Sequence, residues 1–428
     1  MKQTLFGGNG RKDDLSYEGV RVLDPTEGID ATLNLTVEAG VITKIEPGSG
    51  GDRRIVAPAF VDPHVHLRTP GREDEEDIAS GTKAAAAGGY CAILAMPNTE
   101  PAVDSAAVLG ALVERAKDDA AISVGFLAAI SKGQEGAELT EMVELAERGA
   151  AGFTDDGRPV ASPGLLRRAL QYHAVTGRRI AVHCEEPALS RGGHVHEGLV
   201  SAELGFGGYP SVAESVMVGR DLMLAAYENQ PIHVLHLSAR ESVDELRSAR
   251  SAGVQASGEV TPHHLCLTDE AVRSLDPNVK MNPPLRAEED RQALLEALKD
   301  GTIEAIATDH APHARHEKDV PFEEAPFGVT GLETAFSVLY TRLVEPGRLS
   351  IAALIDRMSA GPARIYGLER PRIAVGAPAN LVVLDLERTW RVEESAFRSR
   401  SLNSWLLGQT LKGKVVETVA NGKLAYSA

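Results

Sequence analysis

The feature that most constrains the fold of this 428-residue chain is a repeated alternation of apolar, strand-like runs with amphipathic, helix-like segments. Between about Val56 and Gly367 the alternation occurs eight times. Strands that alternate with helices predict a parallel sheet, and eight units of this length are typical of a (β/α)8 TIM-type barrel. The alternative is an open doubly wound sheet. No GxGxxG motif follows the first strand, so the dinucleotide site common in such sheets is not expected.

The two ends of the chain have a different pattern. From about Leu15 to Ile55, and again after the last helix, short runs alternate apolar and polar residues between turn signals. Asn421-Gly422 has the composition of a tight hairpin turn. We therefore predict that both ends meet in one small β-rich domain, with residues 1–55 as its N-terminal part, 56–370 as the barrel and 371–428 as its C-terminal part.

Polar side chains gather where the apolar runs of the middle region end. In a TIM-type barrel the C-terminal ends of the strands form one face, and function is found there. His64 and His66 end the first run, and because side chains alternate along a strand, both imidazoles should point the same way. An HxH motif alone is weak, since a polar strand end has the same spelling. Here the other runs supply further candidates, namely Asp155, Asp156, His183, His236 and Asp309. Four imidazoles and at least two carboxylates at one barrel mouth favour one or two zinc ions, or another first-row metal.

The charge and cysteine content limit the classes of partner. The formal net charge is −17, which argues against nucleic acid and against an anionic membrane surface, because both need basic patches. No apolar run is long enough to span a membrane. Three widely spaced cysteines give no disulfide framework, which is consistent with a reducing cytoplasm.

A family resemblance adds to this interpretation. The motifs DPHVHLR, AMPNT, GFTDDG, AVHCE, HLS, MNPPLR, ATDHAPH and APFGVTGLE resemble those of the cyclic amidohydrolases in the amidohydrolase superfamily. The match is most similar to the class I dihydroorotases of pyrimidine biosynthesis, and it covers the chain from about Val20 to the C-terminus. The resemblance implies a metal-dependent, reversible hydrolysis of the cyclic amide of (S)-dihydroorotate to N-carbamoyl-L-aspartate.

The resemblance also implies roles for the metal-binding candidates. His64, His66 and Asp309 would hold one zinc ion, and His183 and His236 a second. Asp156 would bridge the two, at the point where many relatives have a carboxylated lysine. Asp309 would in addition be the catalytic acid and base, taking a proton from the attacking water and giving it to the leaving ring nitrogen.

The remaining implied residues would bind substrate. Arg68, whose planar guanidinium suits a carboxylate, would bind the substrate carboxylate together with Asn98 and His313. Asn282 would bind the polar groups of the ring, next to the backbone of Phe327 and Gly328. Each has an ordinary structural explanation: Arg68 as an ion pair with Glu73 or Asp74, Asn282 as a turn residue, and His313 as an exposed loop histidine.

Two alternatives stay open at this point. Hydantoinases, allantoinases and dihydropyrimidinase-like enzymes also open cyclic ureides, but they do not hold a carboxylate in the same place. A low-activity structural partner of aspartate transcarbamoylase is the second alternative, although such proteins typically lose metal ligands, and this chain keeps the whole set. We expect a homodimer from symmetry base rates and the family, with a transcarbamoylase complex also compatible with an active enzyme.

Overall fold

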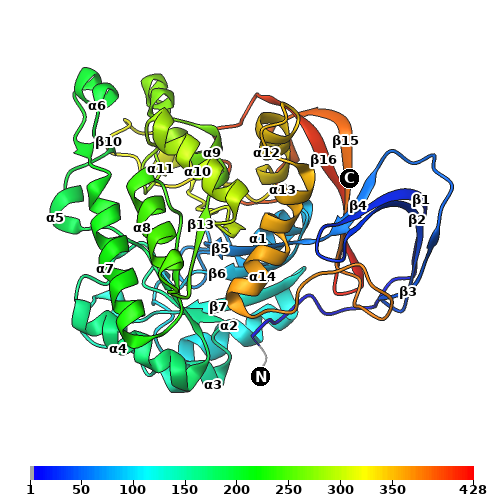
Figure 1. Ribbon diagram of the computed structural model, residues 1–428, viewed down its shortest axis with the longest axis horizontal. Coiled ribbons are helices and arrows are strands. Elements are labelled where there is room, and N and C mark those ends of the chain that lie inside the picture. Colours follow the sequence, from blue (N-terminus) through cyan, green and yellow to red (C-terminus); the bar gives the residue numbers. More distant parts are fainter. Residues whose placement is uncertain (1–3) are drawn as a thin grey trace.

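A parallel barrel forms the larger part of the molecule (Figure 1). The computed structural model describes residues 4–428, and within them eight strands lie side by side in the order β14-β13-β12-β9-β8-β7-β6-β5. The chain returns from β14 to β5 through a parallel bridge between Val65 and His310, where the N–H of His66 donates to the carbonyl of His310 at 2.9 Å. This contact closes the sheet, so the barrel is confirmed and the open sheet is excluded. The strands are β5 Phe60–Val65, β6 Tyr90–Ala95, β7 Ser123–Ala128, β8 Gly152–Phe153, β9 Arg179–Val182, β12 Ile232–Val234, β13 Ala256–Val260 and β14 Ala305–Ile306.

Helices cover the outside of the barrel, which explains why the strands are apolar on both faces. Every residue of β5, β6 and β13 is buried. Local signals fix the helix ends: the side chain of Asp77 accepts from the N–H of Ser80 in a capping box, and Gly177 closes α4 in a left-handed conformation. The principal helices are α1 Ile78–Ala87, α2 Ala106–Asp119, α3 Met142–Arg148, α4 Pro163–Thr176, α7 Val212–Glu228, α8 Arg240–Ser251, α10 Glu288–Asp300, α12 Ala335–Leu339, α13 Ile351–Met358 and α14 Ala360–Tyr366.

Short elements occupy the connections between strands and helices. The Gly-rich segment 192–210 contains a two-stranded parallel pair, β10 with β11. None of the helices in the described part of the chain is both long and apolar enough to cross a membrane. The short elements are α5 Pro187–Ser190, β10 Val195–His196, α6 Leu199–Leu204, β11 Gly208–Tyr209, α9 Pro262–Cys266 and α11 Arg315–Lys318. There are also short 3-10 helices, η1 Lys132–Gln134, η2 Asp269–Ser274, η3 Pro277–Val279 and η5 Glu394–Ala396, and a π-helix, η4 Tyr340–Val344.

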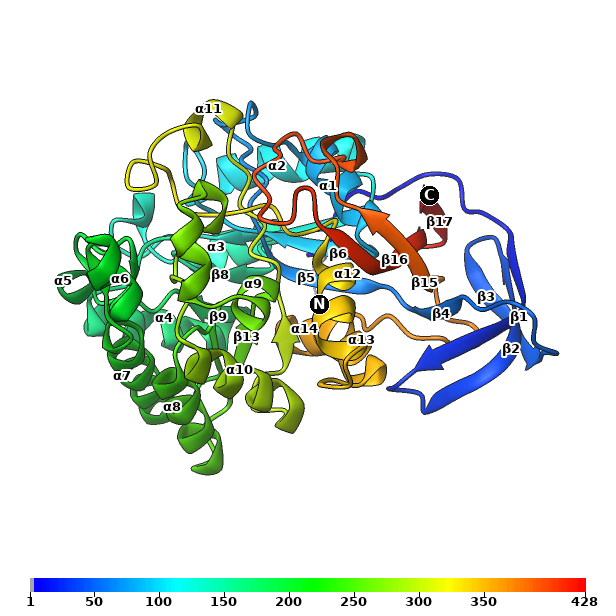
Figure 2. The same cartoon turned by 90° about the horizontal axis from the view of Figure 1, so that it is seen from above.

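A second, seven-stranded sheet is built from both ends of the chain, as predicted (Figure 2). Its order is β17-β16-β15-β4-β1-β2-β3. The apolar run that was predicted to be a single first barrel strand is in fact two strands, because the chain leaves one sheet and enters the other at Ala59. β4 pairs with β1 and with β15 in the small sheet, whereas β5 belongs to the barrel. The strands are β1 Leu15–Asp24, β2 Ile29–Glu38, β3 Val41–Pro47, β4 Ile55–Pro58, β15 Leu381–Arg391, β16 Thr410–Ala420 and β17 Lys423–Ser427.

Candidate metal centre and substrate cavity

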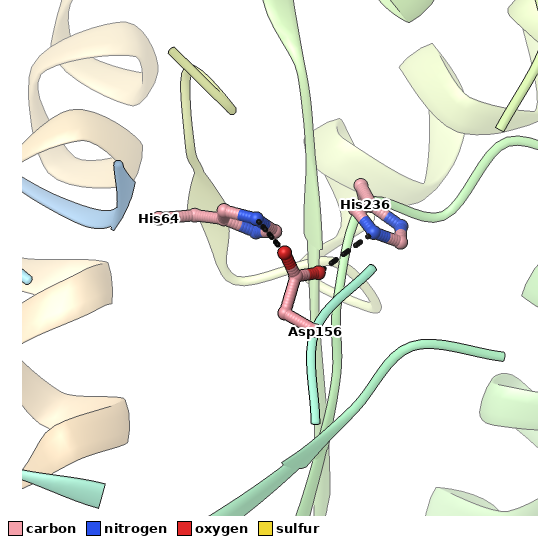
Figure 3. Close-up of side chains that lie close together, drawn as sticks. All are labelled: His64, Asp156 and His236. Atoms are coloured by element: carbon pink, nitrogen blue, oxygen red, sulfur yellow. Dashed lines mark ion pairs between the residues drawn. The ribbon is translucent and has the colours of Figure 1, made fainter. Parts of the chain in front are cut away.

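The aspartate after β8 lies at the centre of the predicted ligand set. Asp156 Oδ2 lies 3.4 Å from His64 Nε2 and 3.5 Å from His66 Nε2. Its other oxygen, Oδ1, lies 3.4 Å from His236 Nε2 and 3.9 Å from His183 Nδ1. Figure 3 shows this carboxylate between His64 and His236. Each oxygen therefore faces a different pair of imidazoles, which is the arrangement that a ligand shared by two metal ions requires.

Asp309 completes the group on one side of the cluster. Its Oδ1 lies 3.1 Å from His66 Nε2 and 3.4 Å from His64 Nε2. The backbone of Asp309 and His236 has positive φ, 48° and 26° respectively, and Arg68 has 55°. Non-glycine residues rarely adopt such angles, and they concentrate where function fixes a side chain. All six predicted metal ligands thus come together. His64 lies in β5, and the other five follow the C-terminal ends of β5, β8, β9, β12 and β14.

The chemistry of these donors fits a divalent metal. Among the described residues 4–428, His64 Nε2 is buried and has no hydrogen-bond partner, although its other nitrogen, Nδ1, lies 2.7 Å from Glu259 Oε1. A carboxylate accepts only from an N–H, so Nδ1 carries a proton, and Nε2 is the nitrogen that faces the cluster and could bind a metal. Burial raises the pKa of Asp156, but the imidazoles of His64 and His236 outweigh it and hold that pKa well below its usual range. Imidazole nitrogens and carboxylate oxygens in one buried cluster are a donor set suited to bind a divalent metal.

A second layer of polar groups fixes the imidazole rings, and most of it was not predicted. Glu259 is fully buried and also accepts from His233 Nε2 at 3.0 Å. Burial raises the pKa of Glu259, but its contacts with these two imidazoles have the greater effect and lower that pKa to about 2. Glu185 Oε2 lies 2.9 Å from His183 Nε2. The only sequence signal for Glu259 is a lone carboxylate inside the apolar run ASGEV.

A cavity of about 470 Å³ opens beside the cluster. Arg68, Asn98 and His313, the three residues predicted to bind the substrate carboxylate, line it together with Asp156. Arg68 Nε lies 2.9 Å from a carboxylate oxygen of buried Glu75. The structural explanation offered for Arg68 was an ion pair with Glu73 or Asp74, and its partner is Glu75 instead. Asn98 Oδ1 lies 2.8 Å from His66 Nδ1, so Asn98 also orients a metal-ligand candidate.

Two further properties of the cavity concern its charge. Burial, together with the charges of Arg68 and Lys318, lowers the pKa of His313 to about 3, so this imidazole is neutral at physiological pH. Arg158 also lines the cavity and is exposed. In the part of the chain that the structure describes, its guanidinium has no ion-pair partner. Arg158 was not predicted, although its position two residues after Asp156 is a sequence signal that could have identified it.

The other predicted substrate residues, Asn282, Phe327 and Gly328, are not part of the lining of this cavity. Asn282 Nδ2 donates to Glu185 Oε2 at 3.0 Å, while its Oδ1 is buried and has no hydrogen-bond partner within the part of the chain that the structure describes. The carbonyl of Phe327 lies 2.7 Å from His313 Nε2. The N–H of Gly328 donates to the carbonyl of Lys280 at 2.9 Å. Asn282 is thus linked to His183 through Glu185. Phe327 is linked to His313, one of the residues predicted to bind the substrate carboxylate.

Comparison with known proteins gives a consistent result. The model of the Amidohydrolase family matches residues 55–425. A dihydroorotase of Geobacter sp. (strain M21) is 44% identical over 426 residues, covering 97% of this chain and 100% of that protein. A dihydroorotase of Acetivibrio thermocellus is 41% identical, covering 95% of this chain and 97% of that protein. Among solved structures, an L-hydantoinase from Arthrobacter aurescens superposes with a TM-score of 0.86 at 25% identity, covering 96% of this chain and 95% of the other.

Proposed function

The chain belongs to the amidohydrolase family, and we propose from this membership how its own residues carry out the reaction of a dihydroorotase. It acts as a hydrolase of a cyclic amide, converting dihydroorotate reversibly to N-carbamoyl-aspartate in pyrimidine biosynthesis. The observation that carries the residue assignments is the carboxylate of Asp156, which has one imidazole pair on each oxygen, beside a cavity that contains Arg68.

The metal is proposed to be zinc, in one or two ions per chain. His64, His66 and Asp309 would hold one ion, His183 and His236 the other, and Asp156 both. Nitrogen and carboxylate ligands are those that zinc takes in catalytic sites. When bound, such an ion lowers the pKa of water to about 7 and polarises an amide carbonyl. The proton on His64 Nδ1, held by Glu259, keeps the Nε2 lone pair available for it.

Asp309 is proposed as the group that moves the proton. Burial raises its pKa, but the imidazoles of His64 and His66 have the greater effect, so its pKa lies well below the usual range and the carboxylate is ionised. An ionised carboxylate can accept the proton of the attacking water. In the same turnover Asp309 would pass that proton to the ring nitrogen as the amide bond breaks, which avoids expelling an amide anion.

Arg68, Asn98 and His313 are proposed to hold the substrate carboxylate. The guanidinium of Arg68 is oriented by Glu75 and by the carbonyl of Pro312, which fixes its plane before substrate arrives. His313, being neutral, contributes a hydrogen bond rather than a charge. Asn282, with the backbone of Phe327 and Gly328, would contact the ring from the other side of the metal cluster.

The second candidate activity is the opening of uncharged cyclic ureides, as in hydantoinases. The fold similarity to an L-hydantoinase is its support, but an arginine in the cavity favours a substrate that carries a carboxylate. A homodimer, a complex with aspartate transcarbamoylase and a cytoplasmic location also remain proposals. A structural role without catalysis is disfavoured, because the full ligand set lies together.

The test is a ring-opening assay of the purified chain on dihydroorotate, with dihydrouracil, hydantoin and allantoin as competitors, and metal content measured on the same sample. We expect preference for dihydroorotate and one to two zinc ions per chain. Asp309→Asn should lose most turnover while metal stays on the histidines. Equal turnover of all four ureides would overturn the substrate assignment, and near-normal rates in Asp309→Asn would overturn the role of Asp309.

A further inference from the structure

The connection between β15 and β16, residues 392–409, leaves the small sheet and extends over the barrel before it returns (Figure 2). Its central residues, 399–403, contact two loops at the barrel mouth. Ser401 Oγ donates to the carbonyl of Glu75, in the loop after β5, at 2.7 Å. Asn403 contacts the loop after β14, which carries His313. Both of these loops contain residues that are proposed to bind the substrate carboxylate.

The side chain of Asn403 is buried, and each of its hydrogen-bonding groups has a backbone partner. Its Oδ1 accepts from the N–H of His313 at 3.1 Å. Its Nδ2 donates to the carbonyl of Ala311 at 3.0 Å and to the carbonyl of Gly328 at 3.2 Å. A side-chain amide has one acceptor oxygen and two N–H donors, so this orientation is the one that satisfies all three backbone groups.

These hydrogen bonds join the two arms of the loop that follows β14. His313 lies on the outgoing arm and Gly328 on the returning arm, and both are proposed to contact substrate. The carbonyl of Asn403 also accepts from the N–H of Thr330 at 3.0 Å, further along the returning arm. The position of His313 relative to Gly328 therefore depends on a residue that the small domain contributes.

Packing alone holds His313 weakly, because it borders two cavities. One is the substrate cavity beside the metal cluster. The other, of about 440 Å³, is lined by His313 together with Lys318, Ser401 and Asn403. A side chain that borders empty space has fewer neighbouring atoms in contact with it, so hydrogen bonds have a larger part in fixing its position.

The same short segment reaches Arg68 through Glu75. The carboxylate of Glu75 lies 2.9 Å from Arg68 Nε, and the backbone of Glu75 is held by Ser401. Ser401 and Asn403 are two residues apart. Arg68 and His313, which come from opposite ends of the barrel sequence, are thus both positioned against residues 401–403.

We propose that Asn403 is a positioning residue for the substrate carboxylate, acting through His313 and Gly328, and that Ser401 supports Arg68 in the same way. The inference rests on the proposed function, because it takes Arg68 and His313 as the groups that bind the carboxylate. Asn403 is not part of the lining of the substrate cavity. The carboxylate is not part of the amide bond that breaks, so loss of this positioning should weaken the binding of substrate and transition state alike, which raises KM and leaves kcat nearly unchanged.

The first experiment measures the ring opening of dihydroorotate by Asn403→Asp over a range of substrate concentrations. Aspartate has the size of asparagine, but its carboxylate has no N–H to donate and would face the carbonyls of Ala311 and Gly328. We expect the KM to rise about tenfold, because His313 loses its fixed position. We expect kcat to change by less than about threefold, and bound metal to stay at the wild-type level.

Thr418→Val is the matched control. Thr418 is also fully buried and also links the small sheet to the barrel, since its Oγ1 donates to the carbonyl of Ala86, in α1, at 2.7 Å. Thr418 contacts none of the loops that carry the substrate residues. The variant should therefore lose stability in urea unfolding but keep the wild-type KM.

A double mutant distinguishes positioning from a general loss of structure. If Asn403 acts through His313, adding Asn403→Asp to His313→Gln should raise the KM by a smaller factor than Asn403→Asp does in the wild type. Ser401→Ala is a milder variant that serves if Asn403→Asp does not fold. It removes one hydrogen bond to the backbone of Glu75 and should raise the KM roughly two- to fivefold.

Three results would overturn the inference while leaving the proposed function intact. They are a wild-type KM in folded Asn403→Asp, or in Ser401→Ala if the first variant does not fold; a lower kcat with an unchanged KM; and factors for Asn403→Asp and His313→Gln that simply multiply in the double mutant. Failure of the wild-type chain to open dihydroorotate would be a different result, since it would overturn the proposed function and this inference with it.

Discussion

Replacing Glu259 by glutamine tests whether the buried second layer of the site controls metal binding. Glu259 accepts a hydrogen bond from His64 Nδ1 and another from His233 Nε2, at 2.7 and 3.0 Å. The substitution keeps size and shape but replaces one acceptor oxygen by a donor and removes the charge. The proton on His64 Nδ1 is then held less firmly, and the tautomer with its proton on Nε2 becomes more populated. That tautomer cannot bind a metal through Nε2.

The expected magnitude follows from these contacts. Substituting a group that orients a metal ligand typically lowers metal affinity 10- to 100-fold, which is about 1.4–2.7 kcal/mol. One imidazole N–H also loses its charged acceptor inside the protein, which costs about 1–3 kcal/mol of folding stability. Glu259→Gln should therefore show both weaker metal binding and a lower free energy of unfolding.

Metal retained after dialysis against buffers of graded free zinc gives the affinity, and urea unfolding of the metal-free chain gives the stability. Glu214→Gln is a matched control. Glu214 is equally buried and accepts from the N–H groups of Ser238 and Ala239, so its loss should lower stability without changing metal affinity. Wild-type metal affinity in folded Glu259→Gln would refute the argument that this carboxylate sets the tautomer of His64.

Four further outcomes follow from the site. Asp156→Ala should lose bound metal and turnover. Asp155→Ala removes an acceptor from two backbone N–H groups, so it should cost about 1–3 kcal/mol of stability but keep its metal. Metal analysis and urea unfolding distinguish the two variants. Arg68→Met should raise the KM for dihydroorotate at least tenfold and leave turnover of uncharged dihydrouracil nearly unchanged, and an equal loss on both would count against carboxylate binding. The pKa of His313 is lowered from 6.5 to about 3 on folding, so between these pH values the unfolded chain binds more protons than the folded chain. The free energy of unfolding therefore falls as the pH falls through this range. The urea midpoint of His313→Gln should depend less on pH there than the midpoint of the wild type does. Arg158→Gln should raise the KM for dihydroorotate several-fold with little change in kcat, and an unchanged KM would exclude a role in substrate capture.

The strands and the metal-ligand candidates were predictable because their signals are local. A buried parallel strand appears as a short apolar run, and the polar residue that ends it lies at the barrel mouth by the geometry of the fold. His64, His66, Asp156, His183 and Asp309 all follow this rule. Their mutual distances did not need to be known to expect a common site.

Residues whose role depends on a long-range contact were not predictable in this way. Nothing near Glu75 in the sequence indicates that its carboxylate is buried against Arg68 and His313. Asn98 was assigned to substrate from the family resemblance, and only the structure shows its contact with His66. The division of the first apolar run at Ala59 depends on β15, which is far along the chain.

The small sheet makes the order of synthesis matter for this protein. β4 lies between β1 and β15, and the chain continues from β4 through Ala59 into β5, which contains His64 and is followed by His66. At roughly 5–20 residues per second, a ribosome needs about 15–65 s to make the segment between β4 and β15. During that interval one edge of β4 has no partner, and an unpaired edge invites association with other chains. We therefore expect a nascent chain of this protein to be open to association with its neighbours until β15 emerges and covers that edge of β4.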